Sequence, residues 1–440
     1  MIRAAGYIFD FISAIVKIFM LLIFILFLPW LFLWNIQVQE HQIIVTTAGN
    51  NFKLGIEILS EEFLKNLTPS SDLSYAVGLI TNQTGIDQKG NKTIDILLQK
   101  GLKIHTIFSP HHGFDGTLVA NAKGSDTCDP KTNIPIINLH GKDGIKKLNK
   151  KNISSIDVFI FDLQDVGIRY YGYAITLLEI MYAAANYEKI IVVLDRPNPL
   201  GSCMEGAFGY GYANHKNNIE SIPWRHGMTI GELARYYNAH ILTKPAKLFV
   251  VPMQNYNRTF SQSNLIMSSL SPNLTSINSC YGYSFLGLLG EIRPFDVGIG
   301  TDKAFQCIML PETFNFPRKK WKELGSLLEP LGIESIFYRY LSKRKQYYYS
   351  GLRLFIRNIN NFSAYKTLLT IITFFKQSGI SFSLSNYFDK VASAIVLRKL
   401  IMEIKNQKEI INELNINIQQ FFNKAHTTFL YQPLPQPTMM

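Results

Sequence analysis

Five clusters of polar and charged residues stand out along the sequence, and they combine groups that bind sugars and carboxylates. Amides and carboxylates suit the hydroxyl groups of a ligand, and guanidinium groups suit a carboxylate. Together the clusters favour a polyhydroxylated ligand that carries a carboxylate. The residues that we expect around one cleft are Asn82, Thr84, His111, His112, Asp162, Gln164, Asp165, Arg169, Tyr171, Asp195, Arg196, Asn198, Glu205, Arg225, His226 and Glu232.

Several of these residues have a structural alternative. An aspartate at the end of a strand often caps the following turn, which leaves a structural role open for Asp162 and Asp195. Arg196 has the alternative of pairing with an aspartate. His226 precedes Gly227 and has the alternative of bonding to the backbone of a turn.

Apolar runs and the segments between them predict the elements that position these clusters. The expected strands are Ala76–Thr81, Lys103–Ser109, Val158–Asp162, Ile190–Asp195 and Leu248–Val251. The expected helices between and after them are Thr93–Lys100, with Thr93 as a cap, Ala174–Asn186 and Thr229–His240. Continuous apolar strands separated by helices predict a parallel sheet that is covered on both faces. Most of the clusters follow a strand, at the edge where open parallel sheets bind ligands.

The domain organisation follows from a change of pattern near residue 280. We expect a Rossmann-like α/β domain over residues 55–275 and a smaller α+β domain over residues 276–440. In the second domain, the expected helices are Arg318–Leu331, Ser363–Ser378 and Asp389–Asn406, with a strand near Leu352–Arg357. The sequence has neither a GxGxxG motif nor a P-loop, so we predict no nucleotide cofactor.

Residues 1–40 predict a membrane anchor followed by a polar spacer. Ile18–Trp34 is an unbroken apolar run, and the apolar stretch that continues upstream of it makes the segment long enough for a transmembrane helix. Arg3 and Lys17 precede the run, and the next lysine or arginine is Lys53, so the globular part is expected outside the cytoplasm. A cleaved signal peptide is the alternative, but the run lacks a small-residue cleavage pattern.

Composition limits the partners and the metal chemistry. The 440 residues are 47% hydrophobic, and the formal net charge is +12. The basic residues are scattered, so nucleic acid is not an expected partner, whereas an anionic membrane or cell wall would suit the charge. His111 and His112 are adjacent, and neighbouring side chains seldom ligate one ion, so no metal is predicted.

The four cysteines form no CxxC pair, and the sequence is compatible either with free thiols or with a disulfide. Oligomeric state is left open.

Several long motifs resemble the exo-β-N-acetylmuramidase family, whose members release N-acetylmuramic acid from the ends of peptidoglycan fragments. The similarity extends from about Gly55 to about Pro433. The matching stretches are GLITNQTGID, FDLQDVGIRYYGY, VVLDRPNPLG, WRHGMTIGELARYYN, SPN at Ser271–Asn273, GTDKAF at Gly300–Phe305, FDKVASAIVLRKLI and LYQP. The resemblance implies a Rossmann-like domain followed by a smaller domain, and peptidoglycan-derived amino sugars as ligands.

The chain departs from this family at two positions that bear on catalysis. His111 occupies the place of the glutamate in the family's Pro-Glu-His-Gly loop, which is its leading catalytic candidate. Later, Val297 stands where the family often has a glutamate, and Ile299 replaces an arginine. Glycoside hydrolysis usually needs two carboxyl groups. The resemblance therefore implies a glycosidase in which His111, Asp165 or Glu205 does the acid–base work, with Glu232 as a further carboxylate. The alternative is a catalytically degenerate relative that binds cell-wall sugars or a protein partner.

Overall fold

The computed structural model describes residues 51–118, 125–140, 144–209, 222–258, 270–342, 346–388, 398, 401–402, 407–432 and 436–437. The chain divides into two compact units, Met1–Ala48 and Gly49–Met440. The predicted anchor at residues 18–34 lies outside the described residues. Within the described part of the chain, none of the helices combines the length and the apolar character needed to cross a membrane.

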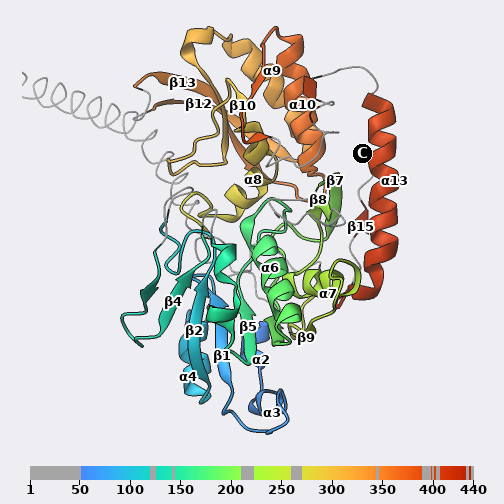
Figure 1. The fold of residues 1–440 in the computed structure, drawn as a ribbon. Helices are drawn as coiled ribbons and strands as arrows, with labels where there is room; N and C mark the ends of the chain where they lie inside the picture. Colours follow the sequence, from blue (N-terminus) through green and yellow to red (C-terminus); the bar gives the residue numbers. More distant parts are fainter. Residues whose placement is uncertain are drawn as a thin grey trace, which may run out of the picture. The chain divides into compact units, whose positions relative to one another are not determined.

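A seven-stranded sheet forms the centre of the first half of the large unit (Figure 1). Its order is β3-β4-β2-β1-β5-β6-β9, and every neighbouring pair is parallel except β3 and β4. Taken in chain order, the parallel strands lie 3-2-1-4-5-6, which is the Rossmann arrangement that we predicted. The strands are β1 (Ala76–Thr81), β2 (Lys103–Ser109), β3 (Thr127–Cys128), β4 (Pro135–Asn138), β5 (Val158–Asp162), β6 (Ile190–Leu194) and β9 (Lys247–Val251).

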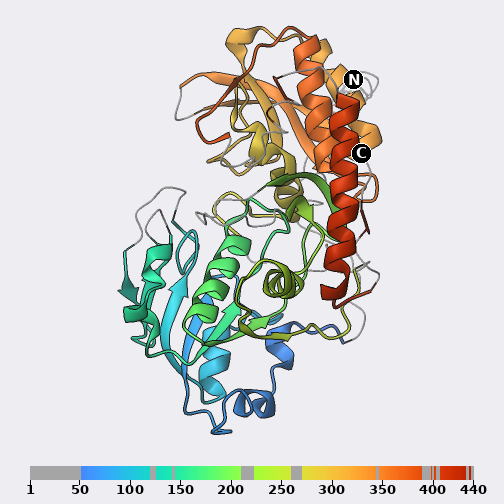
Figure 2. The ribbon, with the colours of Figure 1, turned by 45° about the vertical axis from the view of Figure 1, so that its right-hand side comes forward.

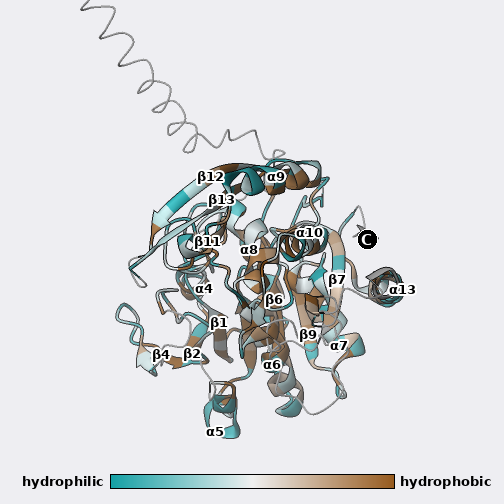
Figure 3. Cartoon of the chain, turned by 90° about the horizontal axis from the view of Figure 1, so that it is seen from above, coloured by the Kyte–Doolittle hydropathy of each residue, from teal (hydrophilic) through white to brown (hydrophobic). Residues whose placement is uncertain are grey.

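Apolar side chains on both faces of the sheet explain why these strands are buried. On β5, Val158 and Ile160 join one apolar cluster, whereas Phe159 and Phe161 join the other, because successive side chains point to opposite faces. Figure 3 shows apolar residues gathered on β6 and α6. The first cluster is covered by α2 (Gly55–Ile58), α3 (Glu61–Lys65) and α4 (Thr93–Gln99), and the second by α6 (Gly172–Asn186) and α7 (Ile230–His240).

The boundaries of the predicted elements agree closely with the structure. β1, β2 and β5 have the expected limits, and the helix expected at Ala174–Asn186 begins two residues earlier, at Gly172. Thr229 caps α7, as its position suggests, and its side chain accepts a hydrogen bond from the Glu232 amide. Thr93 is not the cap of α4, because Lys92 holds that position and the Thr93 hydroxyl donates to Asp162 instead.

The second half of the unit is smaller and mixed, as predicted. A three-stranded antiparallel sheet, β11-β13-β12, packs against α9. Its elements are α8 (Ile277–Leu289), β10 (Ile292–Arg293), β11 (Cys307–Pro311), α9 (Arg318–Leu328), β12 (Ile333–Leu341), β13 (Tyr348–Ile356), α10 (Ala364–Gln377) and β14 (Ser383–Leu384). The helix expected at Asp389–Asn406 lies for the most part outside the described residues.

Three further strands and a long helix connect the two halves. β7 (Cys203–Gly209), β8 (Ile222–His226) and β15 (Gln436–Pro437) form a small sheet, and α13 (Gln407–Ala425) packs against β7. Figure 1 and Figure 2 both show α13 extending from the side of α10 to α7. The remaining short elements are α5 (Lys150–Ile153) and the 3-10 turns Ile145–Lys147, Glu312–Phe314, Glu329–Leu331 and His426–Thr428.

Candidate active site

The loops after β1 and β5 meet at the point where the strand order of the large sheet reverses. Thr81 and Asp162 are paired at the ends of these strands. Asn82 Oδ1 accepts hydrogen bonds from the amide and the hydroxyl of Thr84, at 2.9 and 2.6 Å, and Thr84 Oγ1 accepts one from the amide of Gln164 at 3.0 Å. Open parallel sheets bind ligands in the crevice at such a reversal. The two loops are therefore locked together at the place expected for a ligand.

Asp165 lies in the loop after β5 and keeps one carboxylate oxygen without a partner. Its Oδ2 accepts a hydrogen bond from the Gly167 amide at 2.7 Å, whereas its Oδ1 is buried and has no hydrogen-bond partner. His226 Nδ1 accepts from the Met228 amide at 3.3 Å, which places the ring hydrogen on Nε2, 3.7 Å from Asp165 Oδ2. The side chain of Asp165 is 7% exposed and that of His226 1%. Buried polar atoms are rarely left without a hydrogen bond, so this oxygen marks Asp165 as a candidate for a functional role.

Tyr171 and Tyr173 lie near Asp165, and both form hydrogen bonds to Leu270, which belongs to a later segment of the chain. Burial, and to a smaller extent the charge of Asp165, raises the pKa of Tyr171, and burial raises the pKa of Tyr173 to about 12. Both phenols therefore keep their hydrogens and donate to Leu270 O, at 2.9 and 3.4 Å. Leu270 directly precedes the SPN stretch, where Asn273 Oδ1 accepts from the Gly300 amide at 3.2 Å.

Three histidines gather beyond the ends of β2 and β4. The Nδ1 atoms of His111 and His140 are 3.0 Å apart, and the amide of His112 donates to His140 Nδ1 at 3.4 Å. Burial, with help from the two neighbouring histidines, lowers the pKa of His111 to about 3. His140 was missed by the sequence reasoning, although its position just after a strand end resembles that of the other clusters. Among the described residues, no group of three or more His, Cys, Asp or Glu side chains is arranged to hold a metal ion.

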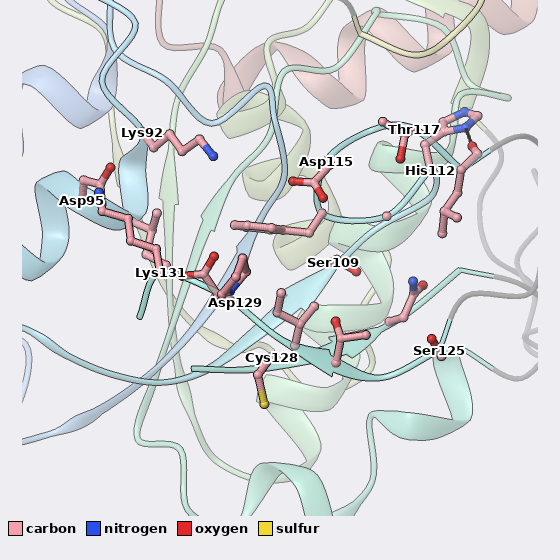
Figure 4. A pocket seen from close by; sticks show the side chains of 18 residues that line it. Lys92, Asp95, Ser109, His112, Asp115, Thr117, Ser125, Cys128, Asp129 and Lys131 are labelled. Carbon is pink, nitrogen blue, oxygen red and sulfur yellow. Dashed lines mark hydrogen bonds and ion pairs between the residues drawn. The ribbon is translucent and has the colours of Figure 1, made fainter. Parts of the chain in front are cut away.

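A cavity of about 390 Å³ opens beside His112 (Figure 4). Ser109, Lys92 and Asp115 line it, and the buried hydroxyl oxygen of Ser109 has no hydrogen-bond partner. Lys131, also on its wall, forms an ion pair with Asp95 at 2.7 Å. An ammonium group, a carboxylate and a hydroxyl around one space suit a ligand with both hydroxyl and acidic groups.

The structural alternative for Arg196 is confirmed, because it pairs with an aspartate, Asp162. The Arg196 guanidinium donates to both Asp162 oxygens, from Nε at 2.5 Å and from Nη2 at 2.8 Å. Both side chains are buried, and Arg196 also donates to Ile86 O at 2.8 Å. This buried pair therefore links the loops that follow β1, β5 and β6.

Asp195 is likewise committed to protein contacts. Its carboxylate accepts hydrogen bonds from the Thr229 hydroxyl at 2.8 Å, the Gly231 amide at 2.8 Å and the Tyr431 hydroxyl at 2.6 Å. Burial raises the pKa of Asp195 to about 6 despite these donors. Asp195 therefore holds the start of α7 and the C-terminal segment against the sheet.

Glu205 and Arg225 form a buried ion pair between the two halves of the unit. Arg225 Nη1 donates to Glu205 at 2.6 Å, and Arg225 Nη2 donates to Leu200 O at 2.6 Å. Glu205 also accepts from the Ser363 hydroxyl and, at 2.9 Å, from the Ala364 amide, at the start of α10. These contacts occupy both oxygens of Glu205 and favour a structural role over a catalytic one.

The other polar residues of the predicted cleft also bond mainly to the protein itself. Glu232 accepts from Arg258, from the Thr229 amide at 3.0 Å and from the Leu430 amide at 2.7 Å. The remaining bonds are from Arg169 to Ala207 O at 2.5 Å and Ile222 O at 3.1 Å, from Gln164 to Pro197 O at 2.7 Å, and from Asn198 to Met228 O at 2.9 Å. The structure thus brings the residues that follow β1, β2, β5 and β6 to one edge of the large sheet, whereas Glu205, Arg225 and His226 lie on β7 and β8. Among the predicted carboxylates, Asp165 keeps a spare oxygen.

The two later departures from the family pattern lie in different surroundings. Val297 is buried in the large apolar core, whereas Ile299 is 58% exposed on the loop that contacts Asn273. An apolar side chain therefore stands in solvent at the position where the resemblance places an arginine.

Comparison with known proteins agrees with this architecture over most of the chain. Residues 77–278 match the N-terminal domain, and residues 281–431 the C-terminal domain, of the family described as Exo-beta-N-acetylmuramidase NamZ. The chain is 30% identical over 399 residues to the peptidoglycan beta-N-acetylmuramidase NamZ of Bacillus subtilis, covering 88% of this chain and 93% of that protein.

Two crystal structures of DUF1343 family proteins from Bacteroides fragilis are also similar. One is 27% identical with a TM-score of 0.74, and the other is 25% identical with a TM-score of 0.63. Each comparison covers 87% of this chain and 99% of the other chain. The chain therefore belongs to the exo-β-N-acetylmuramidase NamZ family.

Proposed function

We propose that this protein is an exo-acting glycoside hydrolase that releases N-acetylmuramic acid from peptidoglycan fragments. Its membership of a muramidase family supports hydrolysis of a peptidoglycan sugar, and the named activity of the Bacillus subtilis relative supports the substrate. The observation that carries the proposal is Asp165, a carboxylate with a buried spare oxygen where the strand order reverses. Carboxyl groups are the usual acid and base in glycoside hydrolysis.

In this proposal Asp165, rather than His111, exchanges the proton. A carboxylic acid at Asp165 would donate its hydrogen from Oδ1 to the glycosidic oxygen, and the resulting carboxylate would take a proton from the attacking water. The Nε2–H of His226, near Oδ2, would stabilise the carboxylate that forms. His111 is unsuited to the acid role because its pKa lies near 3, so its ring is neutral at physiological pH.

A second candidate function is sugar binding without catalysis. It is favoured by the neutral His111 in the loop where the family has a glutamate, and by the buried apolar Val297. These two positions remove the carboxyl groups that the resemblance associates with catalysis. The cavity beside His112 would still offer polar contacts to a cell-wall sugar.

Turnover of a chromogenic N-acetylmuramic acid glycoside by the full-length protein separates the two functions. We expect slow hydrolysis, below about 1 per second, because ordinary enzymes turn over at roughly 1–1000 per second and this site lacks the family glutamate. Binding of N-acetylmuramic acid without turnover, measured by calorimetry, would select the binding function. If the protein neither binds N-acetylmuramic acid nor hydrolyses the glycoside, both candidate functions are refuted.

We also propose that the globular part is exported and anchored in the cell membrane through residues 18–34. The apolar run of these residues and the basic residues ahead of it support the proposal. An alkaline phosphatase fused to the C-terminus is expected to be active, because this reporter matures outside the cytoplasm. A fusion that is inactive, while a reporter requiring the cytoplasm is active at the same position, would contradict export. An intact N-terminus on the membrane-bound protein would exclude a cleaved signal.

A further inference from the structure

The hydrogen bonds around His140 determine which ring nitrogen of His111 carries the hydrogen. The amide of His112 donates to His140 Nδ1 at 3.4 Å, so this nitrogen presents its lone pair and the ring hydrogen of His140 lies on Nε2. His111 Nδ1 is 3.0 Å from the same atom and must therefore be the donor. A neutral imidazole has one N–H, so His111 Nε2 carries a lone pair.

The surroundings keep His111 in this neutral form. Its ring centroid is 4.1 Å from that of His140 and 4.7 Å from that of His112, so a charge on His111 would face two further imidazoles. Partial burial disfavours the charge as well, and its pKa is lowered accordingly. His112 is held separately, because its Nδ1 lies 2.7 Å from the carbonyl oxygen of Leu118. His111 nevertheless remains partly exposed and can reach a ligand.

We propose that His140 is a positioning residue that holds His111 in the Nδ1–H form, so that His111 Nε2 accepts a hydrogen bond from an O–H or amide N–H of the bound amino sugar. The identity of the sugar rests on the proposed function, whereas the state of the ring does not. The loop that carries a glutamate in the family would then bind the substrate in this chain. An unprotonated Nε2 has no hydrogen to donate, so the proton for the leaving group comes from another residue.

The state of the ring is tested by nitrogen-15 NMR of the full-length protein labelled at histidine. The signals of His111 are assigned by their loss in His111→Gln. We expect an unprotonated Nε2 and a protonated Nδ1 in His111 at neutral pH. The reverse assignment, or a doubly protonated ring, would overturn the proposal whatever the protein does to sugars.

Substitution of His140 separates positioning from mere packing. In His140→Phe the aromatic ring remains but the acceptor is lost, so we expect His111 to populate both neutral forms and N-acetylmuramic acid to bind about tenfold more weakly, the usual effect of one hydrogen bond. His140→Asn places its Oδ1 where Nδ1 was and should restore both the ring state and the affinity. An unchanged ring state in His140→Phe would overturn the proposal.

Failure of the proposed function would give a different result. If the ring of His111 has the expected state but the wild type binds no amino sugar, then the ligand is wrong and the role of His140 in fixing His111 stands. If the sugar is hydrolysed but His111 Nε2 carries the hydrogen, then the function stands and this inference fails.

Discussion

Replacing Asp165 with asparagine is expected to lower turnover of the N-acetylmuramic acid glycoside by about 10²- to 10⁴-fold, the usual contribution of a positioned acid or base. The amide keeps the shape of the side chain and can still accept the Gly167 hydrogen bond, but it cannot exchange the proton from the Oδ1 position. Because binding contacts are preserved, the loss should appear in kcat more than in KM.

Asp157→Asn provides a matched control for this substitution. Asp157 lies just before β5, at the other end of the strand, and accepts a hydrogen bond from the Ala76 amide at 2.8 Å. An amide oxygen can accept the same bond, so turnover should be unchanged. If Asp165→Asn keeps wild-type turnover while His111→Gln abolishes it, the reaction depends on the histidine loop and our assignment of Asp165 is wrong.

Replacing Arg225 with methionine is expected to destabilise the fold by roughly 3–5 kcal/mol, as is typical when one partner of a buried ion pair is removed. Glu205 is fully buried and would lose its only guanidinium contact among the described residues, keeping the Ser363 hydroxyl and the Ala364 amide. The free energy of unfolding is measured by urea titration. Arg225→Met combined with Glu205→Leu should recover much of the loss, because no uncompensated charge remains.

Arg357→Met is the matched control for Arg225→Met. Arg357 also pairs with a glutamate, Glu334, at 2.8 Å, but both side chains are more than half exposed. Exposed pairs contribute little, so the expected change is about 0–1 kcal/mol. If Arg225→Met is as stable as the wild type and instead loses affinity for N-acetylmuramic acid, Arg225 binds the carboxylate of the ligand and the ion pair is secondary.

Much of the sheet could be predicted from sequence because its strands are buried on both faces. Runs such as Val158–Asp162 and Ile190–Leu194 are almost continuously apolar, without alternating polar residues. Their limits were predicted to within one residue. β4, β7 and β8 escaped prediction because they are short or contain proline, glycine and charged residues. Helix α13 was missed although Leu414, Ile418 and Phe421 recur at helical spacing along it, and in the structure it packs against β7.

The sequence predicted the location of the candidate site more accurately than the roles of its individual residues. Strand-end positions could be read from the sequence, and the structure brings them to one edge of the sheet. Which of Asp162 and Asp165 pairs with an arginine could not be read, because it depends on side-chain directions in the loop after β5 and on Arg196 from another strand. His140 was overlooked for a related reason, since its partner His111 is 29 residues away in sequence.

The bond between Asp195 and Tyr431 has a consequence for how the chain reaches its folded state. The two residues are 236 positions apart, and the same short segment places the Leu430 amide on Glu232. During translation, the strands of the large sheet are synthesised long before Leu430 and Tyr431. The Asp195 carboxylate therefore lacks its Tyr431 donor until Tyr431 has been synthesised. Contacts of such long range form slowly and leave partly folded chains exposed to aggregation. The synthesis of the segment with Leu430 and Tyr431, rather than of the first strands, thus sets the earliest time at which these contacts of the fold can form.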